Sequence, residues 1–123
     1  MRLSEAILLG SIGSEQGFGA SSGYPNSVKK CAIGAALFAA GVVDISFNNP
    51  FVELRDRWPW TYIDVPCPSI LGYSSTKTYV AEVIYRLNDC LHWTRPQIAA
   101  WVATQEAIYD PQPVELETPA LVA

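Results

Sequence analysis

The single histidine of this chain, His92, follows Cys90 by two residues and Asp89 by three. A thiol, an imidazole and a carboxylate are the groups of a nucleophilic relay, in which the imidazole takes the proton of the nucleophile. Their spacing at the expected end of a helix does not by itself make them face one another. The chain has no other histidine for a second arrangement. We therefore predict no catalytic residues, no cofactor, and a protein that is not an enzyme.

The same residues bear on metal binding. Cys67, Cys90 and His92 could supply three ligands of a tetrahedral zinc site, with Cys31 or Asp89 as the fourth. No Cys-x-x-Cys or His-x-x-x-His pair anchors such a site, so these three residues are weak candidates and we predict no metal. The three cysteines are odd in number and widely spaced, which favours reduced thiols over a disulfide framework.

Aromatic residues in two irregular segments are the candidates for binding a ligand or a partner. Residues 10–27 are rich in glycine and serine and predict a long loop that Phe18 and Tyr24 hold to the body. The loop has neither a Walker pattern nor a dinucleotide fingerprint, which argues against phosphate binding. Trp58 and Trp60 stand on either side of a proline, with Tyr62 close behind. Exposed together, the tryptophans would form a stacking platform; buried, which we favour, they would cap the core.

The bulk composition limits the possible functions. Half of the 123 residues are hydrophobic and 16% are charged, fewer than the roughly 25% of an average soluble domain. Part of the surface is therefore expected to be apolar and covered by a partner, although a compact monomer with a large core remains the alternative. The net charge of −4 makes nucleic acid an unfavourable partner. The longest apolar run, residues 31–43, is too short to cross a bilayer, so we expect a cytoplasmic protein without membrane contact.

Hydrophobic periodicity predicts four main helices, over residues 3–9, 28–40, 75–91 and 95–108. Ser4 is the expected N-cap of the first helix, and Gly41 is placed to end the second. Thr94 and Gln97 form a capping box at the start of the fourth, with Pro96 in its first turn. The second helix is apolar on every side and should lie at the centre of the fold.

The fold class follows from these elements: mainly α, a compact bundle of about four helices with an irregular or small β-hairpin insert between the second and third. The alternating segments 43–47 and 61–65 are the candidate strands of that insert. Residues 1–109 form one helical domain, and residues 110–123 form an acidic, proline-rich tail that we expect to be extended or disordered.

Several motifs resemble those of a family of small proteins from bacteria and their phages to which no activity is assigned. They lie within residues 3–104 and comprise Leu3-Ser4-Glu5-Ala6-Ile7, Cys31-Ala32-Ile33-Gly34-Ala35-Ala36, Trp58-Pro59-Trp60, Cys67-Pro68, Leu87-Asn88-Asp89, Trp93-Thr94-Arg95, Gln97-Ile98-Ala99 and Trp101-Val102. The resemblance implies a compact, mostly helical domain. Many relatives also carry Cys and His residues that suit zinc, but this chain has Ile70, Arg86 and Leu91 at those positions. The resemblance thus implies a largely lost zinc site, with Ile70 and Leu91 filling the vacated space and Cys90 and His92 able to rebuild part of it.

Three functions are compatible with these observations. The first is a non-enzymatic binding or assembly module, of phage or prophage origin, that acts through a protein–protein surface or by self-association. The second is a protein that binds a small, nucleotide-like ligand in a pocket roofed by the glycine-rich loop and walled by Trp58, Trp60 and Tyr62. The third is a degenerate zinc-binding domain associated with nucleic acid.

Overall fold

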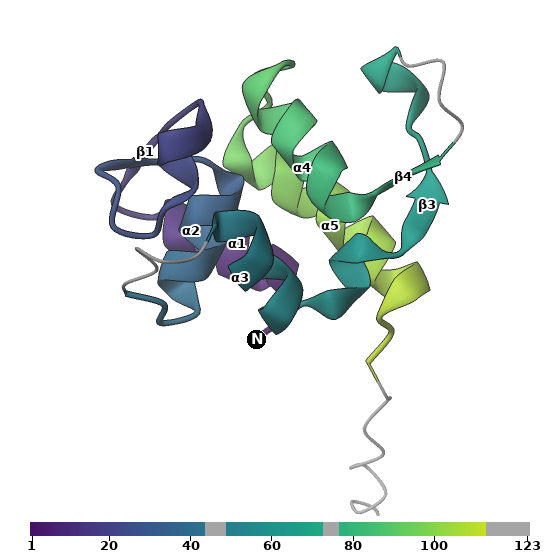
Figure 1. Ribbon diagram of the computed structural model, residues 1–123, viewed down its shortest axis with the longest axis horizontal. Coiled ribbons are helices and arrows are strands. Elements are labelled where there is room, and N and C mark those ends of the chain that lie inside the picture. The colour runs from purple at the N-terminus through teal and green to yellow at the C-terminus, as the bar shows by residue number, and fades with distance from the viewer. Residues whose placement is uncertain (44–48, 73–76, 113–123) are drawn as a thin grey trace, which may run out of the picture.

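The computed structural model describes residues 1–43, 49–72 and 77–112. This part of the chain is built on five α-helices (Figure 1): α1 (Leu3–Ser11), α2 (Ala32–Ala39), α3 (Pro50–Arg57), α4 (Val80–Asp89) and α5 (Arg95–Tyr109). Three short 3-10 helices, η1 (Ala20–Gly23), η2 (Pro59–Tyr62) and η3 (Ser69–Leu71), lie between them. The fold is mainly α, as the sequence predicts. It has one more helix than expected, because Asn49 caps residues 50–57 into a full helix.

Helix α2 lies at the centre and contacts α1, α3, α4 and α5. Residues 32–37 are all buried, which confirms the expectation that an all-apolar helix is packed on every side. Helix α1 approaches α2 closely because Gly10 of α1 has no side chain: a Cβ added there would lie only 1.8 Å from the carbonyl oxygen of Ala35 on α2. The helix ends as predicted at Gly41, whose φ of 85° and hydrogen bond to the Phe38 carbonyl belong to a Schellman motif.

Two small strand pairs flank the helices. β1 (Glu15–Gln16) and β2 (Lys29–Lys30) pair in parallel, whereas β3 (Asp64–Pro66) and β4 (Lys77–Tyr79) pair antiparallel. The second predicted helix therefore begins at Ala32, since residues 29–30 are a strand, and the third begins at Val80, since residues 77–79 are a strand. The partner of the 61–65 segment is thus β4. Residues 44–48, most of the other candidate strand, lie outside the described residues, as do residues 113–123 of the predicted tail.

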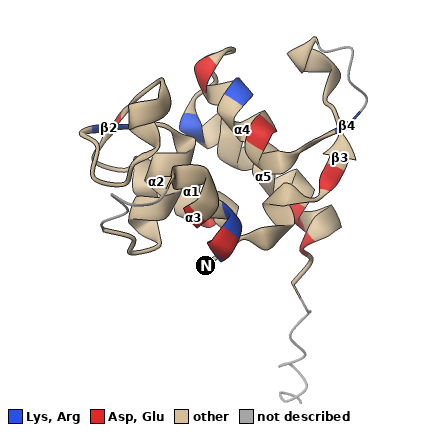
Figure 2. Ribbon diagram, in the orientation of Figure 1, with Lys and Arg blue, Asp and Glu red and all other residues tan. Residues whose placement is uncertain are grey.

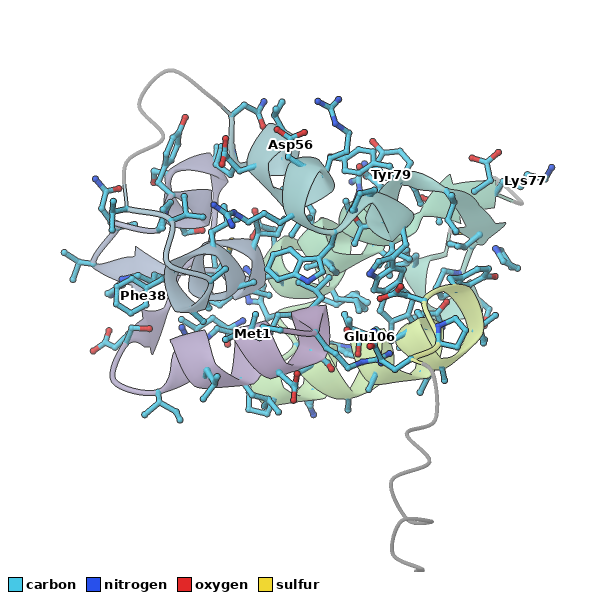
Figure 3. All side chains as sticks on the ribbon, turned by 90° about the horizontal axis from the view of Figure 1, so that it is seen from below. Met1, Phe38, Asp56, Lys77, Tyr79 and Glu106 are labelled. Carbon is cyan, nitrogen blue, oxygen red and sulfur yellow. The ribbon has the colours of Figure 1, made fainter. Side chains whose placement is uncertain are left out.

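The corner between α4 and α5 has the predicted capping box. The Gln97 N–H donates to the Thr94 hydroxyl at 3.2 Å, and the Thr94 N–H donates to Gln97 Oε1 at 2.9 Å. The N-cap prediction for α1 is wrong: Arg2 is the N-cap, and Ser4 lies inside the helix. Ser4 donates its hydroxyl and its N–H to the buried carboxylate of Glu106 on α5. Figure 3 shows Glu106 beside α1. The long-range partner on α5 explains why Ser4 does not cap.

The surface has few charges, and those of opposite sign are interspersed on several elements, α4 among them (Figure 2). Within the described ranges, no helix is both long and apolar enough to cross a membrane.

Candidate functional site

A cavity of about 380 Å³ lies where the glycine-rich loop meets the N-terminal ends of α2 and α3 and one face of α4. Its lining is mostly apolar and aromatic, with a few polar groups, as in typical small-molecule sites. The lining residues are Gly19, Ala20, Gly23, Tyr24, Cys31, Ile33, Asn49, Pro50, Phe51, Glu82 and Tyr85. They come from four separate segments, so only the folded chain brings them together.

Aromatic rings from three elements line this cavity. Phe51 at the start of α3 and Tyr85 on α4 meet edge to face, with ring centroids 6.1 Å apart and an interplanar angle of 67°. Tyr24 lines it from the loop that follows η1. Beside Tyr85, the Glu82 carboxylate accepts a 2.6 Å ion-paired hydrogen bond from Arg86 Nε one helical turn along α4. Flat apolar surface therefore stands next to one oriented carboxylate.

Cys31 brings a thiol to the cavity at the N-cap of α2. Its Sγ accepts the Gly34 N–H at 3.5 Å, and Gly34 has no room for a Cβ, which would lie 2.3 Å from the Ser22 carbonyl oxygen. Burial raises the pKa of the Cys31 thiol, and hydrogen bonds from Gly34 and Ser22 offset part of that rise. The thiol is therefore neutral at physiological pH, which disfavours a role as a nucleophile.

The loop over the cavity is fixed to α4 by two adjacent side chains, Asn88 and Asp89. Asn88 is 1% exposed; its Oδ1 accepts from Gln16 Nε2 at 2.9 Å and from the Ala32 N–H at 3.2 Å. Its Nδ2 donates to the Gly17 carbonyl at 3.0 Å. Asp89 Oδ2 accepts the Gly19 N–H at 3.0 Å, next to the cavity. The two residues thus tie the loop and the start of α2 to the end of α4.

Arg95, the first residue of α5, holds the other end of the loop. This buried guanidinium donates to the Ser14 hydroxyl at 3.0 Å, to the Lys30 carbonyl at 3.1 Å and to the Ser11 carbonyl at 3.3 Å. It also donates to the Ser14 carbonyl. Because these acceptors come from α1, β2 and the turn between α1 and β1, one side chain fixes three segments. Burial lowers the pKa of Arg95 from its ordinary value, but an arginine stays charged across the physiological range.

The five aromatic residues predicted to bind a ligand or partner are not brought together. Tyr24 alone lines the cavity. Phe18 is exposed and its ring lies against that of His92, with ring centroids 4.5 Å apart and an interplanar angle of 34°. Trp58 and Trp60 are buried in the core, where the Trp58 indole donates to the Met1 carbonyl at 3.1 Å. Tyr62 stacks on Tyr79 at 4.9 Å. The predicted roof is thus present, but the cavity is walled by residues other than Trp58, Trp60 and Tyr62.

The weak metal candidates also lie apart. In the described part of the chain, no three His, Cys, Asp or Glu side chains are grouped so that they could hold an ion. Cys90 is exposed near the Arg86 guanidinium, Cys67 is half-buried, and His92 lies on Phe18. Ile70 and Leu91 do not fill a vacated site, because 54% and 39% of their surfaces are exposed. Asp89 serves the loop rather than the imidazole.

Sequence reasoning missed the residues that position the loop. Asn88, Asp89 and Arg95 lie at the corner between α4 and α5, but their side chains bind the glycine-rich loop and the start of α2. Asn88 and Arg95 are buried polar residues at a helix end and a helix start. Their only sequence signal is that each interrupts an apolar stripe. A buried polar side chain needs partners, yet the sequence does not say which segment supplies them.

The described part of the chain is thus a mainly α structure with a cavity beneath the glycine-rich loop, which Asn88, Asp89 and Arg95 hold in place. No family model, curated protein or solved structure matches this chain.

Proposed function

We propose that this protein binds a small organic ligand in the cavity beneath the glycine-rich loop. The observation that carries the proposal is the cavity itself, about 380 Å³, lined by rings of Tyr24, Phe51 and Tyr85. Its volume falls within the range of known small-molecule sites, which are largely pre-formed. The hydrogen bonds of the buried Asn88 and Arg95 fix the loop without any ligand, which supports a cavity that is already formed before binding.

Cys31 allows a direct test of occupancy. Cys31 is 7% exposed and its thiol is neutral, so its alkylation by N-ethylmaleimide should be slow in the free protein. A compound that fills the cavity should slow it further, whereas the exposed Cys90 in the same molecule should react at an unchanged rate. Peptide mapping by mass spectrometry measures both rates in one sample. The compounds would be a set of one- and two-ring aromatics and nucleotides. If none protects Cys31, or if Cys90 is protected equally, the proposal is wrong.

A filling variant provides the matched control. Ala20 is exposed at the edge of the cavity, so Ala20→Trp should occupy the space and abolish binding without altering the core. Ala107→Trp places the same side chain on the exposed face of α5 and should leave binding intact. Binding that survives Ala20→Trp would mean that the ligand binds elsewhere.

A second candidate function is self-association through the outer face of α1. The buried residues of α1 include Leu3, Ile7 and Gly10, yet apolar residues also occupy the opposite face. Leu8 and Leu9 of α1 are 44% and 52% exposed, and Ile12, the C-cap that follows the helix, is 74% exposed. Glu5 is exposed one turn before Leu8 and Leu9 and is the one charged residue of α1 on this face. Because the rest of the face is apolar, it complements a second copy of itself better than an acidic or basic partner.

Multi-angle light scattering tests this candidate directly. The wild-type chain should form a dimer whose population rises with concentration, and Leu9→Arg should return it to a monomer. Val28→Arg is the control, because Val28 is 87% exposed and lies on the loop before β2. A wild-type chain that stays monomeric at the highest soluble concentration excludes self-association through α1.

A further inference from the structure

We infer that the ligand of this cavity is a planar aromatic cation of the amidinium or guanidinium type, bound with its paired N–H donors toward Glu82. This inference rests on the proposed function and names the chemical class that the site would select. It depends on three features of the lining: its charge, its available hydrogen-bonding groups and its aromatic faces.

Among the described residues that line the cavity, Glu82 is the only charged one. Arg86 holds one oxygen, Oε2, through its Nε at 2.6 Å, and this contact orients the carboxylate. No hydrogen bond from the described residues reaches the other oxygen, Oε1. The Glu82 side chain is 25% exposed, so the carboxylate is partly desolvated at the wall. A carboxylate with one oriented and one available oxygen favours N–H donors and repels anions.

The helix ends at the cavity would favour an anion if their N–H groups were available, but the caps already occupy them. At α2, the Gly34 N–H donates to Cys31 Sγ and the Ala32 N–H to Asn88 Oδ1. At α3, the Phe51 N–H donates to Asn49 Oδ1 at 2.7 Å. The remaining electrostatic effect of the α2 and α3 helix dipoles is small and falls off within one turn. Because Glu82 is already ion-paired with Arg86, the preference of the site comes from its Oε1 acceptor, which pairs with N–H donors and not with an anionic oxygen.

The aromatic rings of the lining add to the preference of the site for a planar cation. Tyr85 follows Glu82 by three residues on α4, so the phenol ring and the carboxylate are neighbours along one helix face. Phe51 stands edge to face with Tyr85, and both line the cavity. Aromatic faces attract cations, and planar guanidinium-type groups stack on them. The Arg86 guanidinium already lies over the Tyr85 ring, with its Cζ 5.6 Å from the ring centroid, so a bound cation would have to use a ring face that Arg86 leaves open. A flat cation thus gains from both the rings and the carboxylate.

The test compares three probes of nearly equal shape: benzamidine, which is cationic, benzamide, which is neutral, and benzoate, which is anionic. Isothermal titration calorimetry on the full chain should give the tightest binding for benzamidine, with benzoate weaker by about tenfold or more. Protection of Cys31 from alkylation places the bound probe in the cavity.

Two variants make the outcome specific. Glu82→Gln should weaken benzamidine by about tenfold while leaving benzamide unchanged, and Tyr85→Leu should weaken both. Asp56→Asn is the control, an exposed acid on α3 that does not line the cavity. Circular dichroism establishes that each variant is folded.

Failure of this inference is distinguishable from failure of the proposed function. If benzoate or benzamide binds as tightly as benzamidine, or if Glu82→Gln leaves benzamidine binding unchanged, the cationic preference is wrong although the cavity still binds ligands. The inference also fails if other aromatics protect Cys31 and none of these three probes does. If no compound of any class protects Cys31, both the proposed ligand binding and the inferred preference for a cation are wrong.

Discussion

Asn88→Ala should destabilise the protein more than most single substitutions, because one side chain satisfies two buried backbone groups on different segments. Truncation leaves the Ala32 N–H and the Gly17 carbonyl without the partners they have at 3.2 Å and 3.0 Å. Each buried group that loses its partner costs about 1–3 kcal/mol. Gln16 loses one acceptor but keeps the Trp93 carbonyl at 2.7 Å, so its contribution is small. We expect the free energy of unfolding to fall by about 4 kcal/mol.

Urea denaturation at pH 7, followed by tryptophan fluorescence, measures this change. With a denaturant slope of about 2 kcal/mol per molar, the unfolding midpoint should fall by about 2 M. Hydrogen exchange should accelerate at the Ala32 amide and in the loop around Gly17. Asn26→Ala is the control, an exposed amide in the same loop that should change stability by less than about 0.5 kcal/mol. If Asn88→Ala loses less than about 1 kcal/mol, or no more than the control, the loop is not held as we describe.

Three further predictions follow from close packing and from buried ionisable groups. Gly10→Ala should lower the free energy of unfolding by about 3 kcal/mol in urea denaturation, because the new Cβ would lie 1.8 Å from the Ala35 carbonyl oxygen. A change below about 1 kcal/mol would contradict the close approach of α1 and α2. Glu106→Gln should cost about 1–3 kcal/mol by the same assay, since a buried carboxylate loses charge-assisted bonds; an unchanged midpoint would refute this. Burial raises the pKa of Cys31 and raises that of Tyr62 to about 12, so the folded state retains these protons at alkaline pH longer than the unfolded state. Stability should therefore hold below about pH 8.5 and decline toward pH 12, and Cys31→Ser with Tyr62→Phe should flatten that decline in denaturation curves measured across the range.

The sequence alone determined the features that depend on near neighbours in the chain. The capping box of Thr94 and Gln97, the end of α2 at Gly41 and the central place of α2 each follow from residues within a few positions of one another. Capping groups and helical stripes act over one or two turns, where the chain itself keeps the partners close. The mainly α fold class follows from the same short-range rules.

Tertiary structure decided everything that depends on which distant segments meet. Ser4 looks like a cap in sequence, but Glu106, 102 residues away, takes both of its donors. Residues 77–79 continue a helical stripe, yet they pair as a strand with residues 64–66.

The candidate site also depends on contacts between segments that are distant in the sequence. Its cavity is lined from four segments, and its roof is held by Asn88 and Arg95, whose partners lie 56 to 84 positions away. A polar residue in an apolar stripe indicates that a buried partner must exist, because an unpaired buried group is costly. Only the packing of α4 and α5 against the loop decides which backbone groups those partners are, since hydrogen bonds between distant segments leave no pattern in the spacing of residues.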